Sequence, residues 1–405
     1  MNPLRDANCI YDGGTKAIAS SSFKQATQQF QMNQLLETAI LQKSITEGTF
    51  KPNKGRKFLL NERGKLRYIT SNTIQDKTIK NVLCDEIIMP AIQRYLIYDN
   101  GASQKGKGTS FTRARLEQHL HEYYRKNRTN EGYIALIDFS GYYANILHSR
   151  CKEVMCDMLR GIDVNIATST KRLMDEILRS YALDVSYLSD EKVAELYSGK
   201  VDPMLNKDVD VGLLTGTKML AKGVDIGERF AQCIGLAYAY KIDNYIEIVR
   251  GCGLHARYSD DSYIIASSKY YLEDILSGVR KVANEYGIII NEDKTKIVKI
   301  SSPFVFLQVK YCLTKTGKVT KRINSRCVAR ERKRLKMYAK YLKDGVMQYG
   351  EIENNFKSWL CGNWQLMSSK QIYELNALYK QLFGKEIKWK KKGRARLRWL
   401  MEHNL

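Results

Sequence analysis

The sequence of 405 residues lacks the patterns that identify zinc sites. Its nine cysteines are scattered, and none forms a Cys-x-x-Cys pair. Cys151 and Cys156 are close together, but no second pair accompanies them. Histidine is scarce, and His119 and His121 do not belong to a His-Glu-x-x-His pattern. An odd, dispersed set of cysteines is typical of proteins in a reducing cytoplasm, and we expect a cytoplasmic location.

Membrane-directed segments are also absent from the sequence. The N-terminus shows no charged-then-apolar signal, and no apolar run approaches the length of a membrane span. The glycine-containing stretch 99–109 lacks the Gly-Lys-(Ser/Thr) ending at the required spacing, which excludes a P-loop NTPase. We therefore expect a globular protein that has no membrane partner.

Acidic residues are in deficit. The chain has 43 Asp and Glu against 66 Lys and Arg, and its net charge of +23 favours a polyanionic partner. Residues 321–405 alone carry 21 basic and 7 acidic residues, concentrated in the runs 330–336 and 388–399. Such runs are either solvated faces or phosphate-binding surfaces. The basic residues that we expect to contact template or primer are Arg332, Arg334, Lys390 and Arg394.

The tetrapeptide Tyr258-Ser259-Asp260-Asp261 interrupts an apolar stretch that resumes at Tyr263. This pattern predicts a tight β-hairpin with both carboxylates at its tip. Burying adjacent acids costs several kcal/mol unless a cation neutralises them, and Mg²⁺ prefers such hard oxygen ligands. Two such ions about 4 Å apart can bind an attacking hydroxyl and a leaving pyrophosphate. An exposed Asp-Asp turn is the alternative.

A second acid lies upstream. The apolar run Tyr133–Ile137 predicts a buried strand that ends at Asp138, and Tyr143 follows five residues later. A lone Asp at a strand end is often only a helix cap or turn former. The order of strand, acid, glycine-containing helix start, aromatic residue and Tyr-x-Asp-Asp, however, resembles the bacterial and prophage reverse transcriptases. This lineage includes retrons, group II introns, diversity-generating retroelements and defence-associated enzymes.

The resemblance implies a catalytic centre. Asp138, Asp260 and Asp261 would bind two Mg²⁺ ions, with Mn²⁺ as a substitute, and the main-chain carbonyl of Phe139 would be a further ligand. Tyr143 falls where the family has a steric gate against the ribose 2′-hydroxyl. Lys294 lies in a block, 286–296, similar to the one that neutralises the leaving pyrophosphate. A core aromatic and an exposed lysine are the alternatives for these last two residues.

Further blocks follow the family order. Arg67, with Lys65 as a second cation, lies in a predicted strand–turn–strand at 58–69 that would bind the triphosphate. The stretch 222–227 resembles the loop beside the incoming nucleotide, where Gly227 would allow close approach. Phe306–Val309 resembles the primer-grip hairpin.

The sequence departs from the family at two of these blocks. Asp225, Glu228 and Arg229 replace the usual residues of the template loop. We expect Glu228 either to form a salt bridge with Arg229 or, like Asp225, to touch the template base. Gln308 replaces a glycine in the primer-grip block, which puts ordinary primer placement in question.

The implied fold class is α+β: a right-hand polymerase with fingers, a palm built on an antiparallel sheet flanked by helices, and a helical basic thumb. We expect an N-terminal helical extension at 1–50, fingers at 51–130, a palm at 131–320 and a thumb at 321–405. The apolar positions of the extension serve either packing or an RNA contact: Phe23, Phe30, Leu35, Leu36, Ile40 and Leu41.

The implied activity is RNA-directed DNA polymerisation from dNTPs on a primer 3′-hydroxyl. The partners would be an RNA template or non-coding RNA and the DNA product, and an accessory protein or a second copy of the chain stays open. Anti-phage defence with a non-coding RNA is the favoured setting, and a diversity-generating or retron-like element is the alternative. An RNA-dependent RNA polymerase and a non-catalytic RNA-binding scaffold are the competing classes.

Overall fold

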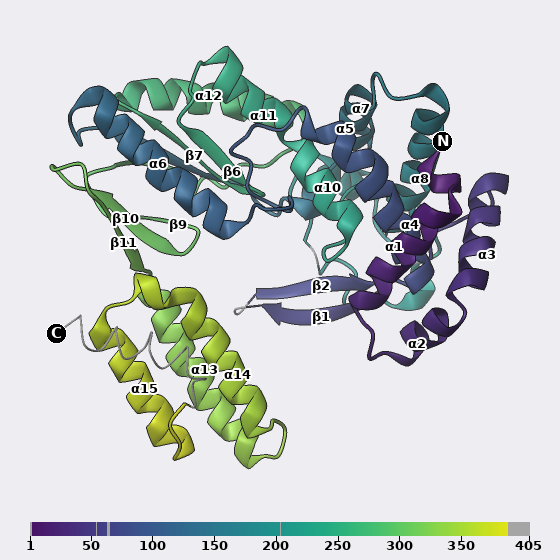
Figure 1. Cartoon of the computed structure of the whole chain (residues 1–405). Helices are drawn as coiled ribbons and strands as arrows, with labels where there is room; N and C mark the ends of the chain where they lie inside the picture. The colour runs from purple at the N-terminus through teal and green to yellow at the C-terminus, as the bar shows by residue number, and fades with distance from the viewer. Residues whose placement is uncertain (1, 54, 63–64, 203, 388–405) are drawn as a thin grey trace. The chain divides into compact units, whose positions relative to one another are not determined.

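The computed structural model describes residues 2–53, 55–62, 65–202 and 204–387 (Figure 1). Helices and antiparallel strand pairs are mixed along the chain, which confirms the predicted α+β class. The described residues form two compact units, 2–119 with 133–297 and 120–132 with 298–387. The expected segments 1–50, 51–130 and 131–320 lie mostly in the first unit, while 120–132 and the strands after 298 belong with the C-terminal helices in the second. No helix among the described residues has the length and apolar character needed to cross a membrane.

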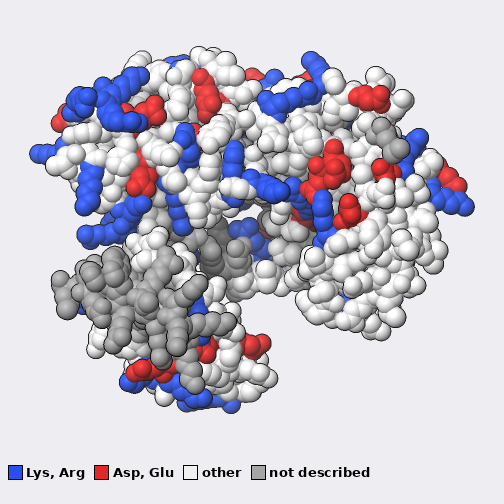
Figure 2. All heavy atoms as spheres, in the orientation of Figure 1, with Lys and Arg blue, Asp and Glu red and all other residues white. Residues whose placement is uncertain are grey.

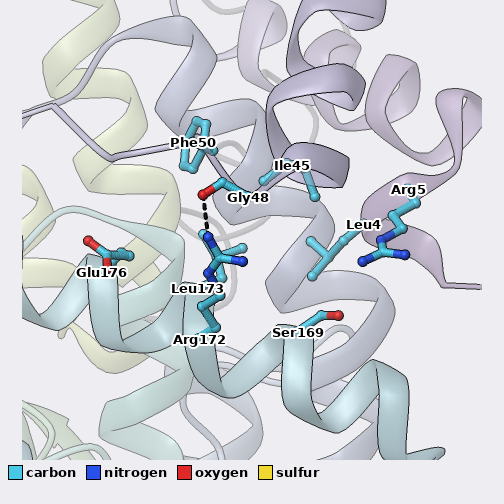
Figure 3. Close-up of a pocket in the computed structure, with 9 residues that line it drawn as sticks. All are labelled: Leu4, Arg5, Ile45, Gly48, Phe50, Ser169, Arg172, Leu173 and Glu176. Carbon is cyan, nitrogen blue, oxygen red and sulfur yellow. Dashed lines mark hydrogen bonds between the residues drawn. The ribbon is translucent and has the colours of Figure 1, made fainter.

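The N-terminal residues are helical, as expected, and α1 packs on α3 and α4 of the same unit. Gly48, in a left-handed conformation (φ +69°), ends α3, and its carbonyl accepts a hydrogen bond from Arg172 of α8. A small cavity of about 60 Å³ lies beside this contact, lined by Leu4, Phe50 and Leu173 among others (Figure 3). The elements of this part are η1 (Pro3–Arg5), α1 (Ala7–Ala19), α2 (Gln25–Met32), α3 (Gln34–Glu47) and α8 (Val164–Tyr181).

The predicted strand–turn–strand is present as an antiparallel hairpin, with Phe58 opposite Ile69 and Leu60 opposite Arg67. Thr73 caps the following helix by accepting a hydrogen bond from the Asp76 amide at 3.1 Å. The elements are β1 (Arg56–Glu62), β2 (Lys65–Ser71), α4 (Ile74–Val82), the π-helix η2 (Leu83–Ile88), α5 (Met89–Gln93) and α6 (Thr109–Asn127).

A four-stranded sheet in the order β6-β7-β3-β8 forms the centre of the first unit. Ile134, Ala135, Tyr263 and Ile264 on its paired strands are fully buried, and α12 packs against the sheet (Figure 1). Such near-continuous apolar runs suit strands that are covered on both faces. The elements are β3 (Tyr133–Asp138), β6 (His255–Tyr258), β7 (Asp261–Ala266), α12 (Lys269–Glu285) and β8 (Lys296–Lys299).

Between β3 and β6 the chain is mostly helical, but it also contains a two-stranded sheet that the sequence did not predict. β4 and β5 pair antiparallel around a small core of Val185, Val201 and Leu220. The ammonium of the buried Lys222 donates to three carbonyls at the end of α9, at 2.7–3.0 Å. The elements are η3 (Tyr143–Asn145), α7 (His148–Met158), β4 (Leu183–Asp184), α9 (Asp190–Ser198), η4 (Val211–Leu213), β5 (Met219–Leu220), α10 (Arg229–Tyr238), α11 (Tyr240–Asn244) and the π-helix η5 (Tyr245–Val249).

The second unit joins a three-stranded antiparallel sheet to a helical bundle. Phe356 and Tyr379 stack in the bundle core with ring centroids 5.1 Å apart. Helices were expected here, whereas the strands had been assigned to the preceding segment. The elements are β9 (Phe304–Phe306), β10 (Val309–Leu313), β11 (Val319–Ile323), α13 (Ser325–Lys343), α14 (Tyr349–Asn363), η6 (Trp364–Leu366) and α15 (Ser369–Phe383).

A fully buried ion pair fixes the β6–β7 hairpin to the helices beneath it. Arg257 of β6 donates to both carboxylate oxygens of Asp243 on α11, at 2.7–2.9 Å. It also donates to the carbonyls of Leu236 (2.9 Å) and Ser259 (3.2 Å). Burial would raise the pKa of Asp243, but the charges and hydrogen bonds of Arg257 and His255 hold it below its usual value. The contribution of Asp243 to stability is therefore complete at neutral pH and is lost as the pH falls through this lowered pKa.

We predict that Arg257→Ala lowers the free energy of unfolding by about 3–5 kcal/mol at pH 7, because Asp243 is left as a buried charge without its main partner. Without Arg257 the carboxyl pKa rises, so the folded state holds a proton that the unfolded state has lost, and the deficit shrinks from pH 7 toward pH 5. Urea unfolding at both pH values measures this. The control Arg280→Ala, which breaks a surface pair with Glu292, costs less than about 1 kcal/mol. Equal stability of the Arg257→Ala and wild-type proteins at pH 7 would contradict the prediction.

Candidate active site

Three acidic residues from two distant segments of the sequence lie at one end of the central sheet. Asp138, the last residue of β3, pairs in register with Asp261, the first residue of β7. Asp260 precedes Asp261 in the turn between β6 and β7, and its carbonyl accepts a hydrogen bond from the Phe139 amide at 3.1 Å. The turn has two residues, Ser259 and Asp260, with Ser259 in the left-handed region (φ +58°). The predicted hairpin and the convergence of the acids are thus both present.

Lys294 lies directly on this cluster. Its ammonium contacts both oxygens of the Asp138 carboxylate, at 2.8 and 2.9 Å. Asn291, in the same block, donates from its side chain to Asp138 Oδ2 at 2.9 Å and from its amide to the Asp138 carbonyl at 2.8 Å. Asp138 is therefore held by two neighbours from one short segment. The lysine side chain is 54% exposed and remains accessible to a solvent-borne anion.

The charges of the cluster act on one another. Burial raises the pKa of Asp260, and the negative charge of Asp138 raises it further, while Lys294 and Arg67 oppose the shift. The Arg67 charge thus acts on the turn from β2. Burial would lower the pKa of Lys294, but Asp138, Asp261 and Asp260 together keep it above its usual value. The site consequently combines crowded carboxylates with two cations at its margin.

The donor set suits a hard divalent cation, since it offers carboxylate oxygens and a raised carboxyl pKa that positive charge would relieve. Within the described part of the chain, however, no group of three or more His, Cys, Asp or Glu side chains is already arranged as a metal cage. Lys294 holds both oxygens of Asp138. A metal ion bound here would therefore compete with the lysine for that carboxylate.

Tyr143 lies beside the turn, where the sequence suggested a gate. Its hydroxyl is 3.3 Å from Ser259 Oγ, and its ring lies against Gly235, where an added Cβ would approach the ring within 2.9 Å. Burial and then the charge of Asp260 raise its pKa, so the hydroxyl is neutral at physiological pH. The neighbouring Tyr142 is buried instead and donates to the Gly235 carbonyl at 2.8 Å. Of these two rings, only that of Tyr143 is partly exposed beside the acids.

The loop 222–228 approaches the β1–β2 hairpin. Gly227 has φ +104°, a conformation that favours glycine, and an added Cβ would lie 3.2 Å from Ile69 Cγ2. Asp225 faces Lys57 of β1 at 3.7 Å, and burial raises its pKa while Lys57 opposes the shift. Lys65 lies in β2, but its side chain is outside the described part of the structure.

Glu228 does not occupy either of the positions expected for it. Its carboxylate is buried and forms an ion pair with Lys80 of α4 at 2.5 Å. Tyr181 of α8 donates to it at 2.6 Å, and Asn72 donates to its other oxygen. A buried carboxylate with three partners is not positioned to touch a template base. The expected partner Arg229 instead pairs with Asp85 of η2 at 3.0 Å.

In the second unit, Gln308 has φ +70° in the turn between β9 and β10, a conformation that glycine adopts without strain. Together with Arg326, Arg330 and Lys333 it lines a groove of about 510 Å³. Arg332 pairs with Glu374 of α15 and Arg334 pairs with Glu331, so both contribute to contacts within the unit. Lys390 and Arg394 lie outside the described residues.

Sequence reasoning missed the residues that hold the carboxylates in place, namely Asn291, Arg257 and Asp243. The signal for the last two was present: Arg257 falls in a strand next to the acids, and Asp243 falls in an apolar helical stretch. A charged residue in each of two buried elements indicates a pair. Sequence alone does not show which two pair with each other.

No protein-family model matches the sequence, and no curated protein matches it either. The structure is similar to apo telomerase from Candida tropicalis truncated from its C-terminal domain, with 15% identity, a TM-score of 0.41 and coverage of 66% of this chain and 54% of that one. It is similar to telomerase from Candida albicans in complex with the TWJ fragment of telomeric RNA, with 12% identity, a TM-score of 0.44 and coverage of 87% and 64%. It is also similar to apo telomerase from Candida tropicalis, with 13% identity, a TM-score of 0.42 and coverage of 87% of this chain and 66% of that one. The chain thus spans between about half and two thirds of the length of these proteins. Similarity at this level does not assign a function.

We predict that Glu228→Ala lowers the free energy of unfolding by about 3–5 kcal/mol, because it leaves the Lys80 ammonium buried without its charged partner. The double variant Lys80→Met/Glu228→Leu removes both charges and recovers most of that loss. Urea unfolding of the three proteins measures the two effects. If the single variant is no less stable than the double variant, the buried pair does not hold this loop.

Proposed function

We propose that this chain is an RNA-directed DNA polymerase, in which segments 51–130, 131–320 and 321–405 serve as fingers, palm and thumb. The observation that carries the proposal is the register pairing of Asp138 on β3 with Asp261 on β7, with Asp260 next to Asp261 in the β6–β7 turn. The order of the sequence blocks and the net charge of +23 support a nucleic-acid substrate. The reaction is attack of a primer 3′-hydroxyl on the α-phosphate of a dNTP, with release of pyrophosphate.

The side chains around the acids have separate tasks in this proposal. Arg67 binds the triphosphate and brings positive charge toward Asp260. Lys294, whose raised pKa keeps it protonated, neutralises the charge that develops on the leaving pyrophosphate. Tyr143 closes the space that a ribose 2′-hydroxyl would need. Catalysis then arises from positioning and from neutralisation of developing charge.

Mg²⁺ would be held by Asp138, Asp260, Asp261 and the Phe139 carbonyl. When bound, it would supply charge neutralisation at the reacting phosphate. The chain's contribution is to hold the carboxylates: Arg257 binds the carbonyl of the turn, and Asn291 fixes Asp138. Mn²⁺ offers the same charge and ligand preference.

Two other classes make different demands on these residues. An RNA-dependent RNA polymerase would have to admit the 2′-hydroxyl past Tyr143, and a non-catalytic scaffold would not need the carboxylates. For the biological setting we favour anti-phage defence with a structured non-coding RNA, and a diversity-generating or retron-like element is second. Both settings rest on the resemblance of the sequence blocks. Sequencing the nucleic acid that copurifies with the chain distinguishes them.

We predict that Asp260→Asn/Asp261→Asn reduces dNTP incorporation on a primed RNA template at least ~1,000-fold, because the centre loses its charged oxygen ligands. RNA affinity should stay within about threefold of wild type, because it depends on the basic residues. Primer extension and filter binding measure the two quantities. Asp208→Asn, which neutralises an exposed acid of the same unit, serves as the control and retains full activity. Retained polymerisation by the double variant rules out the proposed catalytic centre.

We predict that Tyr143→Ala lowers the preference for dNTPs over NTPs by at least tenfold, or about 1.4 kcal/mol in transition-state discrimination. Tyr143→Phe retains the ring and therefore the preference. Single-nucleotide incorporation with matched dNTP and NTP pairs gives the ratio of kcat/KM values. An unchanged ratio in the alanine variant would remove Tyr143 from the role of gate.

A further inference from the structure

The N-terminal helices expose large apolar side chains instead of burying them. Five such residues lie within 18 positions, on or beside α2 and α3, with 54–86% of their surface accessible. Leu36 and Ile40 are one helical turn apart on the same side of α3, and Leu35 adjoins them. The five residues are Phe23, Met32, Leu35, Leu36 and Ile40. Residues 23–42 are called the neutral face below.

The buried side of α3 carries two polar residues, Gln34 and Thr38, together with the apolar Leu41. Gln34 and Thr38, also one turn apart, face inward, and Gln34 Nε2 donates to the Tyr11 carbonyl at 2.9 Å and to Thr15 Oγ1 at 3.0 Å. Leu35, Leu36 and Ile40 thus lie outside, while an amide and a hydroxyl share the inner side with Leu41. The three exposed apolar residues are therefore available to a partner.

Charge is almost missing from the neutral face. Glu37 is the single charged residue among positions 25–42, in a chain where 27% of residues are charged, and exposed lysines lie only at the two ends of the face, at Lys24 and Lys43. It is already occupied, because it accepts a hydrogen bond from Gln75 at 3.0 Å. Figure 2 shows the surface over α2, at the lower right, almost free of coloured side chains. With cations only at its ends, this surface does not suit nucleic acid or an anionic membrane.

We propose that the neutral face is an interface with a second copy of this chain. Two chains of charge +23 repel one another. A face with few charged residues lets them associate with the least electrostatic repulsion. In a two-fold dimer each residue meets the same patch of its partner, so the polar residues must be self-complementary. Glutamine satisfies this because its amide both donates and accepts, and exposed glutamines surround the apolar residues at Gln25, Gln28, Gln29 and Gln31.

The exposed area is of the size that such an interface needs. Five large apolar side chains at these exposures present on the order of 600 Å². A standard interface buries about 800 Å² on each partner, and the flanking glutamines supply the remainder. The proposal does not depend on the polymerase activity, because the acids and the neutral face share no residue.

Mass measurement by light scattering or sedimentation tests the proposal on the full chain, treated with nuclease and kept in high salt. The wild type should have the mass of two 46.7 kDa chains. The dimer should persist in high salt, because apolar contacts are not screened, whereas copies bridged by nucleic acid separate. A wild type that is monomeric at micromolar concentration overturns the proposal, whatever else the face binds.

Charge-swapped variants test the two-fold contact itself. Leu36→Glu/Ile40→Glu and Leu36→Lys/Ile40→Lys should each be monomeric, with the dimer dissociation constant raised at least ~100-fold, because like charges meet across the axis. Mixed together, the two should form a heterodimer. The control Ile248→Glu/Tyr270→Glu places the same charges on residues exposed by 74% and 81% elsewhere in this unit and should remain dimeric. Dimers of either swapped variant alone, or a mixture that stays monomeric, overturn the proposal.

A photo-crosslinking residue at position 36 of an otherwise wild-type chain gives a readout that does not depend on variant stability. It should yield a covalent dimer, and the absence of that product overturns the proposal. Circular dichroism checks that the swapped variants are folded. If they are not, the crosslinking result decides.

Discussion

The buried pair of Asp243 and Arg257 is the constraint on which the arrangement of the candidate site depends. A guanidinium in the interior needs a full set of acceptors, and Arg257 finds them on α11, on α10 and on the turn of its own hairpin. Because these acceptors lie on separate elements, the pair sets the position of the hairpin relative to the helices. The register of β7 against β3 then decides that Asp261 faces Asp138 and not its neighbour.

A second buried pair performs the corresponding task for the loop at 222–228. Glu228 joins α4, α8 and the start of α10 through Lys80 and Tyr181. Glu228, which was unusual in the sequence, is therefore a structural residue that holds this loop in place. Around the acids, Tyr143, Lys294 and Arg67 have exposed or partly exposed side chains, and these are the residues to which the proposed function assigns substrate contacts.

Short-range patterns in the sequence predicted much of this site. The strand end and the turn were predictable, because each depends on neighbouring residues alone. These are the apolar run that ends at Asp138 and the two residues that interrupt the apolar stretch before Asp261. Ion-pair partners from distant segments were not predictable. Nothing near Glu228 in the sequence indicates Lys80, and the adjacent Arg229 was the obvious candidate. The assignment of the strands after residue 298 to the second unit, and the small sheet of β4 and β5, depend likewise on contacts that only the folded chain defines.

Ser259 has two opposing effects in the turn: its backbone conformation is strained, and its side chain makes a polar contact. Its backbone is left-handed, a conformation in which glycine would be relaxed and a residue with a Cβ is not. Yet its hydroxyl lies 3.3 Å from the Tyr143 hydroxyl. A glycine here would relieve the backbone and at the same time remove that hydroxyl contact. Backbone strain in the turn and the polar environment of the Tyr143 hydroxyl are therefore coupled through one side chain.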